Sequence, residues 1–412
     1  MLNCKMAIEK SWGGVHFKSF TILNCHHMNK KLLLSALIIT SIIAGCSTEN
    51  LQGSFSGAKS SSTTKSGLKL SIASPAVDDQ LVYGGQADIL IGKFSLKAAN
   101  EDYAVSKITL ENANSGSEDS IKSLKIKYPT SLSSPTTLDG SSSVTFSGTT
   151  ANFVGLNLMV AKGSSANFEV YVSTNIHADD SGASDTGDKI QMNFTTTSAF
   201  EATGQTSGKI LSATNVTTST LSTEPAYIFR NLPEITVADT SIDLEYGAEA
   251  AVFDFTVQNS KGTGPLSIRN IGLDVSSSGL FTGSAGLGGT WKIVDSRDGT
   301  VYGTGVLTSA NKGYVSTSSI VVEEGSSTGL SVLAPIVDDG TLNTNTLSVR
   351  ISSDSSQGPV FNTSVTSAYG DAISGALASS ALVWTDRPTS SSVLWHNGYE
   401  IEGLPTSYVT ST

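Results

Sequence analysis

The chain of 412 residues is poor in cysteine, and the few it has lie at one end. Its three cysteines, Cys4, Cys25 and Cys46, all fall within the first 46 residues. The 366 residues that follow can form no disulfide among themselves, although disulfides commonly stabilise small exported domains. That length is enough for two or three domains that are stable through core burial alone.

Histidine is also scarce, which argues against most hydrolytic chemistry. Only His177 and His396 lie beyond Cys46, and neither belongs to a metal-binding spacing such as H-E-x-x-H. No pair of carboxylates stands out as a glycosidase pair. The glycine-rich segment 283–289 follows no strand-to-helix pattern, so it is interpreted as a loop and not as a phosphate cradle. We therefore predict that the protein is not an enzyme.

Positive charge is limited. Lys and Arg number 25 and Asp and Glu number 36, and five basic residues but only one acidic residue precede Cys46. The part from Cys46 onward thus has 20 basic and 35 acidic residues, a net charge of −15. Because phosphate contacts need clustered Lys and Arg, the sequence predicts no nucleic-acid partner. Anionic lipid headgroups would not attract such a chain either.

The region before Cys46 has the layout of an export signal. Met28 and two lysines precede an apolar run from Leu32 to Ile43, and small residues and a cysteine follow. The segment Ile43-Ala44-Gly45-Cys46 resembles the lipobox of bacterial lipoproteins. That resemblance implies that Cys46 is diacylated and becomes the N-terminus of the exported protein.

The alternative is a short buried helix with Cys46 as a small core residue. Twelve mostly apolar residues are too few to span a bilayer, which needs roughly 20. Each buried methylene of a lipid chain contributes about 0.8 kcal/mol, so the two or three chains expected on a lipoprotein cysteine give durable attachment. We favour the lipid anchor.

The expected parts of the chain follow from this signal. Residues 1–27 carry no periodic pattern and precede a better start at Met28, so they are interpreted as an upstream misreading of the gene. Residues 28–45 are the signal peptide. Residues 46–67, rich in Ser, Thr and Gly, have almost nothing to bury and are predicted to form a flexible tether with an end-to-end distance on the order of 25 Å.

Beyond Leu68 the apolar residues alternate with polar ones, as in Phe94-Leu96-Ala98 and Phe168-Val170-Val172. This is the two-residue period of strands with one buried face. The spacers are Gly, Ser, Asn and Asp clusters typical of turns, and no stretch sustains a helical period. The sequence predicts an all-β chain of antiparallel β-sandwich architecture.

The chain also repeats itself at an offset of roughly 160–170 residues. The order of similar segments is kept, which predicts two tandem sandwiches, residues 68–221 and 234–412, joined by a linker at 222–233, where Pro225 and Pro233 interrupt pairing. The matching segments are 81–87 with 244–250, 105–110 with 268–273, 162–165 with 324–327, and 198–200 with 367–369.

At this level the body resembles the immunoglobulin-like repeats of large bacterial surface proteins. The match is strongest in the G-S-S segment before a strand and in the aromatic stretches 384–387 and 395–399, which Gly403-Leu404-Pro405 follows. The resemblance implies an architecture and a surface location, not a chemistry. The cysteine pair of the antibody family is absent, as is a tryptophan in the first copy, which leaves the strand topology open.

The loop 179–188 is the best candidate for a metal site. Asp179, Asp180, Asp185 and Asp188, with Ser, Thr and backbone oxygens, could supply the six to eight ligands that calcium takes. The spacing is not that of the helix-loop-helix calcium motif, and the second copy keeps only two of the acids. An acidic solvated turn is the favoured alternative, and no other cofactor is expected.

Trp291, Trp384 and Trp395 all lie in the second copy. Trp291 sits in an alternating strand and is predicted to be core. Trp384, Trp395 and Tyr399 could stack on sugar rings or contact a partner, or they could close the open end of the sandwich and protect an edge strand. The second interpretation is favoured.

Together these features predict a lipid-anchored protein of the cell envelope that faces outward, on the outer membrane if the organism has one. Its expected role is structural or adhesive, with the membrane as partner through the lipid. The alternative is a module that binds an envelope glycan or a surface protein through distal loops and the C-terminal aromatics.

Overall fold

The computed structural model describes two separate units of the chain. It covers residues 6–12, 15–21, 67–146, 148–176, 186–238, 241–242, 249–278, 289–306, 312–336, 345–360, 375–386 and 393–411. The first unit contains an antiparallel hairpin of β1 (Met6–Trp12) and β2 (Val15–Thr21), and the second unit begins at Thr64. The hairpin falls within residues 1–27, and whether these belong to the natural protein stays a prediction. The lipobox, Cys46 and the tether up to residue 66 lie outside the described residues.

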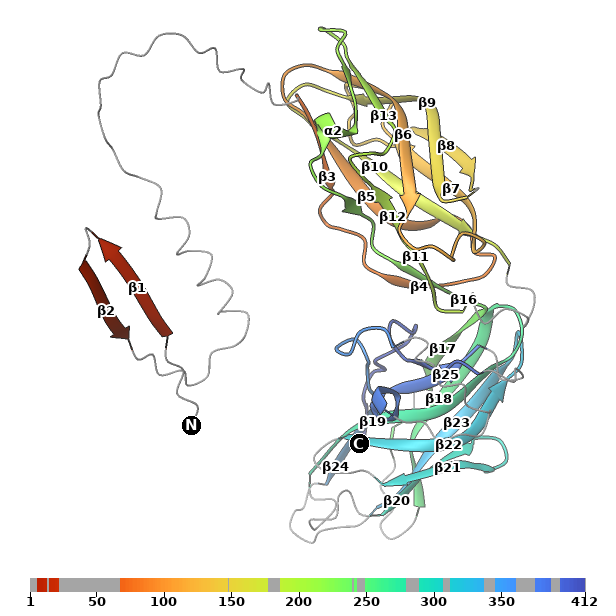
Figure 1. The fold of residues 1–412 in the computed structure, drawn as a ribbon. Helices are drawn as coiled ribbons and strands as arrows, with labels where there is room; N and C mark the ends of the chain where they lie inside the picture. The colour runs from red at the N-terminus through yellow and green to blue at the C-terminus, as the bar shows by residue number, and fades with distance from the viewer. Residues whose placement is uncertain are drawn as a thin grey trace. The chain divides into compact units, whose positions relative to one another are not determined.

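The first sandwich has two antiparallel sheets (Figure 1). One has the order β3-β5-β10-β7-β8, and the other has the order β14-β13-β6-β12-β15 with β9 paired to the free side of β6. The elements are β3 (Leu68–Ile72), β4 (Gln80–Tyr83), β5 (Ile89–Ala98), β6 (Tyr103–Asn112), β7 (Ile121–Tyr128), β8 (Gly140–Thr145), β9 (Thr150–Val160), β10 (Ser165–Thr174), β11 (Asp188–Ile190), β12 (Met192–Phe194), β13 (Phe200–Gly204), β14 (Ile210–Leu211), helix α2 (Ala213–Val216) and β15 (Leu221–Ser222).

Alternation along these strands builds the first core. In β10 every second side chain, from Ala166 to Thr174, is buried, and those between face outward. Phe94 and Phe168 lie opposite each other in register and stack with their ring centroids 5.1 Å apart. Large aromatic pairs of this kind contribute strongly to a core, because each ring removes much apolar surface from water.

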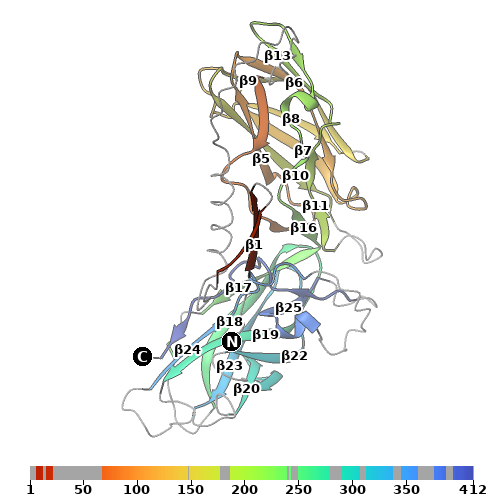
Figure 2. The same ribbon diagram turned by 60° about the vertical axis from the view of Figure 1, so that its left-hand side comes forward.

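The second sandwich is one continuous antiparallel sheet folded on itself. Its order is β17-β18-β23-β20-β21-β22-β19-β24-β27, with β25 also paired to β19 and β26 paired to β25. The C-terminal end lies beside β24, where β27 pairs with it (Figure 2). The elements are β17 (Asn231–Val237), β18 (Glu249–Gly262), β19 (Leu266–Ser278), β20 (Thr290–Asp295), β21 (Val301–Val306), β22 (Lys312–Val322), β23 (Ser327–Pro335), β24 (Thr346–Ile351), the 3-10 helix η1 (Gly375–Ser379), β25 (Leu382–Thr385), β26 (His396–Asn397) and β27 (Val409–Thr410).

The two sandwiches share one pairing scheme, which confirms the predicted tandem β-sandwich fold. The path β3-β5-β10-β7-β8 recurs as β17-β18-β23-β20-β21, and the pairing of β6 with β9, β12 and β13 recurs in β19 with β22, β24 and β25. Even an irregularity recurs. Ser106 is skipped where β6 pairs with β9, and Arg269 is skipped where β19 pairs with β22. Such bulges bend a strand in a defined way.

The predicted G-S-S turns are also equivalent. Gly163 N donates to Ala98 O at 2.9 Å, and Gly325 N donates to Asn259 O at 2.8 Å. Both glycines have a positive φ, 73° and 69°, which residues with a Cβ atom rarely adopt. One proposed match fails, however. Phe200 pairs with Ile108 just as Leu382 pairs with Ile271, so the counterpart of Phe200 is Leu382 and not Tyr369.

The predicted linker 222–233 is built largely of strands. It contains all of β16 (Ala226–Phe229), which pairs in parallel with β4 and antiparallel with β11 to form a three-stranded sheet. Pro233 does not end pairing, because it lies in β17 at the register shift between Leu232 and Glu234. A proline is tolerated at such a bulge since no ladder hydrogen bond is needed from it.

This three-stranded sheet, which we call the junction sheet, divides its side chains between the two cores. Val82 and Ile228 belong to the first core, whereas Leu81, Tyr83 and Phe229 pack with the second. The division follows from the two-residue period of a strand, which sends neighbouring side chains to opposite faces. The two sandwiches are therefore joined by shared structure, with no free linker between them.

Candidate functional site

Only part of the predicted calcium loop can be placed. Asp179, Asp180 and Asp185 lie outside the described residues, and Asp188 is the first residue of β11, opposite Ile228. Within the described residues, no three His, Cys, Asp or Glu side chains gather closely enough to hold a metal ion. Calcium binding by the loop therefore stays a prediction.

The C-terminal aromatic residues are buried. Trp384, Trp395 and Tyr399 are 0%, 3% and 8% exposed. This burial corrects the idea that they form a surface for ligand contact, because their ring faces are covered by protein. Trp291, also 0% exposed, is a core residue as predicted.

Trp384 lies at the centre of an aromatic cluster. Its Nε1 donates to Asn397 O at 2.9 Å, and its ring centroid is 5.0 Å from that of Phe229 and 5.1 Å from that of His396. Trp395 lies under the guanidinium of Arg269, 5.6 Å from the ring centroid. Arg269 is the residue that the bulge of β19 skips, so the bulge is what directs this side chain toward the tryptophan.

His396 is paired with a buried carboxylate. Its Nε2 is 4.0 Å from Asp386 Oδ1, and both side chains are 0% exposed. The other carboxylate oxygen of Asp386 accepts from the Thr186 hydroxyl at 2.9 Å and from Arg230 N at 2.8 Å. A histidine next to a carboxylate can act as a base, but this one has no contact with solvent and therefore no access to a substrate. The pair ties β25 to residues of the junction.

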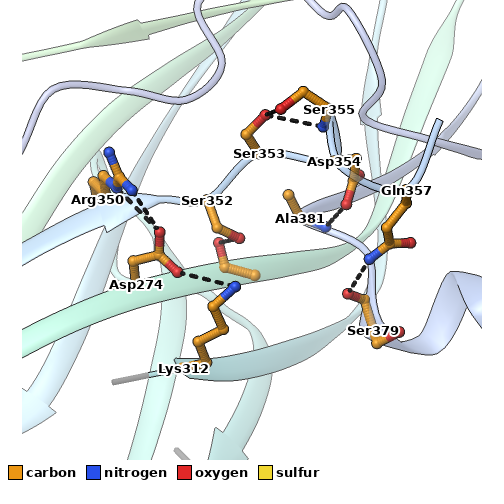
Figure 3. Close-up of polar contacts among 11 residues, drawn as sticks. Asp274, Lys312, Arg350, Ser352, Ser353, Asp354, Ser355, Gln357, Ser379 and Ala381 are labelled. Atoms are coloured by element: carbon orange, nitrogen blue, oxygen red, sulfur yellow. Dashed lines mark hydrogen bonds and ion pairs between the residues drawn. The ribbon is translucent and has the colours of Figure 1, made fainter. Parts of the chain in front are cut away.

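A second buried carboxylate, Asp354, organises the irregular C-terminal segments. It is 1% exposed, and its two oxygens accept from Ala381 N and Gly398 N, both at 2.7 Å. Figure 3 shows it between the end of β24 and the segment that holds Ala381. Burial raises the pKa of this carboxyl above its ordinary value, against the lowering effect of the two backbone donors.

Nearby, a more exposed ionic group crosses β19 and its neighbours. Asp274 Oδ2 accepts from Arg350 Nε at 3.1 Å and Nη2 at 3.0 Å, and Lys312 Nζ lies 3.9 Å from Asp274 Oδ1 (Figure 3). Two N–H donors of Arg350 on one oxygen of Asp274, with Lys312 near the other oxygen, connect β24 and β22 to β19. Asp274 Oδ1 has no hydrogen-bond partner among the described residues, and the contacts drawn in the figure join protein groups to one another, so we interpret the arrangement as structural.

One cavity of about 270 Å³ lies against the junction sheet. It is lined by Leu81, Tyr83, Gln86, Leu232, Pro233, Lys261, Glu400, Ile401 and Glu402. Ligand cavities in proteins generally measure about 300–1,000 Å³, so this one is small for an organic ligand.

Two charged groups of that cavity, Lys261 and Glu402, are paired with each other. Lys261 contacts Glu402 and lies 3.7 Å from Glu234. Burial alone would lower the pKa of Lys261, but the two glutamates outweigh it and raise the pKa. Glu400, whose φ is 51°, has its pKa raised by burial first and then by Asp79 and Asp78. The cavity is small and its ammonium group, Lys261, is already paired, so we assign it to the packing of the junction.

The junction also includes a direct hydrogen bond between the two sandwiches. The Tyr399 hydroxyl donates to Asp79 Oδ2 at 2.7 Å. Burial, followed by this bond and the charge of Asp79, raises the pKa of the phenol above its ordinary value. Sequence reasoning missed Asp79, Asp354 and Asp386, because isolated aspartates in Ser-rich turns give no signal of their distant partners.

Comparison with known proteins gives only remote likeness. No family model and no curated protein sequence matches the chain. Among solved structures, the chain is similar to the CupB6 tip adhesin from Pseudomonas aeruginosa, at 10% identity and a TM-score of 0.20, over 69% of this chain and 93% of that one.

Two further structures are similar at the same level. CBD12 from CALX1.2 has 9% identity and a TM-score of 0.21 over 66% of this chain and 76% of that one. The BSP domain of a biofilm-associated protein has 11% identity and a TM-score of 0.21 over 70% of this chain and 57% of its own. At TM-scores this low the likeness carries no argument, and the fold assignment stands on this chain's own strands and registers.

Proposed function

We propose that the protein is a lipid-anchored component of the bacterial cell envelope with a structural or adhesive role. The observation that carries the proposal is the segment 28–46, where a short apolar run ends in the lipobox-like Ile43-Ala44-Gly45-Cys46. Cys46 holds the lipid, and the tether permits the body to reorient. The two sandwiches face outward from the membrane, which is the outer membrane where the organism has two membranes.

The structure of the body supports a role in presentation rather than catalysis. The titratable pair His396 and Asp386 is buried, so it is not accessible to a substrate. No described helix is both long and apolar enough to cross a membrane. Attachment through the lipid is consistent with these features.

The alternative role, binding an envelope glycan or surface protein through the C-terminal aromatics, is not favoured by the geometry. Trp384 and Trp395 are buried, and removing either would first damage the core. A binding role would need another surface of the molecule.

The proposal is tested by the mass and location of the full chain expressed in a bacterium with a lipoprotein pathway. We expect the mature protein to begin at Cys46, to carry the mass of two or three acyl chains and to sediment with membranes. Cys46→Ser should abolish the acyl mass and the membrane attachment, whereas Cys25→Ser, the matched control, should change neither. An unacylated, freely soluble wild-type protein contradicts the proposal.

A further inference from the structure

One face of the first sandwich is rich in lysine, although the chain as a whole is acidic. The outward positions of the sheet β3-β5-β10-β7-β8 alternate with buried ones, and lysines occupy many of them. We call this surface the lysine face. It carries Lys69, Lys93, Lys97, Lys125 and Lys127.

Strand register brings these residues together from distant parts of the sequence. Lys69 lies opposite Lys97 across β3 and β5. On the neighbouring strands Glu169 lies between Lys93 and Lys127, and Tyr171 lies opposite Lys125. Adjacent strands are about 4.8 Å apart and outward positions along a strand about 6.6 Å apart, so the five ammonium groups cover one compact area.

Acidic groups neutralise only part of this charge. Lys93 Nζ lies 3.3 Å from Glu169 Oε1, and Lys125 contacts Asp88. For Lys69, Lys97 and Lys127, no carboxylate of the described residues lies within ion-pair distance. The face therefore has a net positive charge, although the whole chain carries −11. An anion that approaches this face is attracted by the local positive charge.

The positions between the lysines are polar. Ser71, Ser95, Asn167, Ser141 and Ser143 point to the same side. The one aromatic ring, Tyr171, is covered by Lys127 and Lys125, whose Nζ atoms lie 4.7 and 5.5 Å from its centroid. Its phenol donates to Glu169, and burial together with this bond raises its pKa to about 12. Apart from the half-buried Leu90, which lies opposite Tyr171, the face offers cations and hydroxyls.

A depression of about 480 Å³ continues the lysine face at one end. Ser173 and Ser123 line it, and they are the register pair that follows Tyr171 and Lys125 along β10 and β7. The exposed side chain of Lys122 and the amide of Gln86 also line it. Its volume is in the range of small-ligand sites, about 300–1,000 Å³, and most of its lining side chains are polar, with Ala87 and Ile176 as the apolar ones.

We propose that the lysine face and this depression bind an anionic polysaccharide, one that carries carboxylate or sulfate groups along a hydroxylated chain. Ammonium groups spaced over an open sheet suit repeated negative charges, and the serine and asparagine side chains between them can exchange hydrogen bonds with sugar hydroxyls. The inference goes beyond the proposed function, because binding on this face requires neither the lipid nor a particular location.

Other polyanions fit less well. Single-stranded nucleic acid is bound on exposed aromatic rings, and the ring of Tyr171 is covered by lysines. Residues 68–221 contain ten lysines and no arginine, the residue that recognises phosphate in a bidentate way. An anionic bilayer would attract the charge, but the described strands of the lysine face present no large exposed apolar side chain to insert into it, and the depression presents Ile176 alone.

The test is a binding titration of the full chain with dextran sulfate and with polygalacturonate, using neutral dextran as the uncharged probe. Both anionic polymers should bind and dextran should not. Lys97→Gln combined with Lys127→Gln should weaken binding about tenfold, and raised salt should weaken it further. The matched control is Lys107→Gln with Lys209→Gln, which removes the same charge from the other sheet and should change affinity less than about twofold.

Three outcomes overturn the proposal. They are no binding of either anionic polymer, equal losses in the two double variants, or tighter binding of single-stranded DNA or phosphatidylglycerol vesicles than of both polysaccharides. Because all substituted side chains are exposed or half-exposed, unfolding should not obscure the result, and circular dichroism checks this.

Discussion

The two sandwiches have the same strand pairing but treat one sheet edge differently. In the second sandwich β21 pairs with both β20 and β22, which joins the two layers. In the first, β8 is the counterpart of β21, and among the described residues it pairs with β7 alone. A shared topology therefore does not determine how an edge is protected.

The physical reason lies in two side chains. Ser142 and Val144 of β8 occupy the positions of Gly303 and Gly305 in β21. A Cβ atom on Gly303 would lie 2.3 Å from Ser316 O, and one on Gly305 would lie 2.5 Å from Tyr314 O. Only glycine allows the backbones of β21 and β22 to approach this closely. The first sandwich instead leaves β8 as a short edge strand of 6 residues, and shortness limits unwanted pairing at an edge.

The largest effect should come from breaking that closure. Gly303→Val places side-chain atoms against the backbone of β22, and we expect the free energy of unfolding to fall by about 3 kcal/mol. The matched change in the first sandwich, Ser142→Val, should cost less than about 0.5 kcal/mol, since its strand has no second neighbour to displace. Urea unfolding followed by circular dichroism measures both. Equal losses would show that the closure is not what distinguishes the sandwiches.

A smaller effect concerns the turns that follow β12 and β24, which are equivalent strands of the two sandwiches. Asp354→Ala would leave Ala381 N and Gly398 N buried without their acceptor, and we expect a loss of about 2 kcal/mol. In the first sandwich, Ser198 accepts from Thr195 N at 2.9 Å in a short local turn. Ser198→Ala should cost about 1 kcal/mol or less. Thermal unfolding decides between them, and a greater loss for Ser198→Ala contradicts this interpretation.

The smallest effect tests the contact between the sandwiches. Tyr399→Phe removes the hydrogen bond to Asp79 and should cost about 1 kcal/mol at neutral pH. Because the pKa of the folded phenol is raised above the unfolded value of about 10, its contribution is complete below about pH 10 and is lost as the pH rises toward the folded pKa. The stability difference between wild type and variant should therefore shrink above about pH 10.

Urea unfolding at about pH 8 and about pH 11 measures this difference. Tyr408→Phe is the control, because Tyr408 is 47% exposed, and it should match wild type at both pH values. A pH-independent difference for Tyr399→Phe would mean that the phenol is not coupled to Asp79.

The sequence predicts the regular parts of this fold well, for physical reasons that are local. Alternation in the strand of Phe168 and the positive φ of Gly163 both follow from a few neighbouring residues. The error at Phe200 arose where similarity was sought in a Ser-rich segment, whereas the true counterpart, Leu382, is defined by pairing with β19. Pairing across such a distance leaves no local pattern.

The candidate sites were less predictable for the same reason. Trp384 and Trp395 are near the C-terminus in sequence, yet they are buried because β25 returns to the side of β19. Net charge was also a poor guide to the surface. The lysines of the lysine face come from three strands, and only register shows that Lys97 and Lys69 are neighbours. Whole-chain acidity concealed a local area of opposite sign.

The junction sheet has a consequence for anyone who wishes to dissect the molecule. Cutting the chain at residue 230 would remove Phe229 from the core of the second sandwich. It would also leave the apolar side chains of Leu81 and Tyr83 exposed on the first sandwich. Neither fragment would keep the packing that it has in the full chain. The smallest fragment that keeps both cores complete runs from β3 through β27, because the two sandwiches repeat one fold and share the junction sheet.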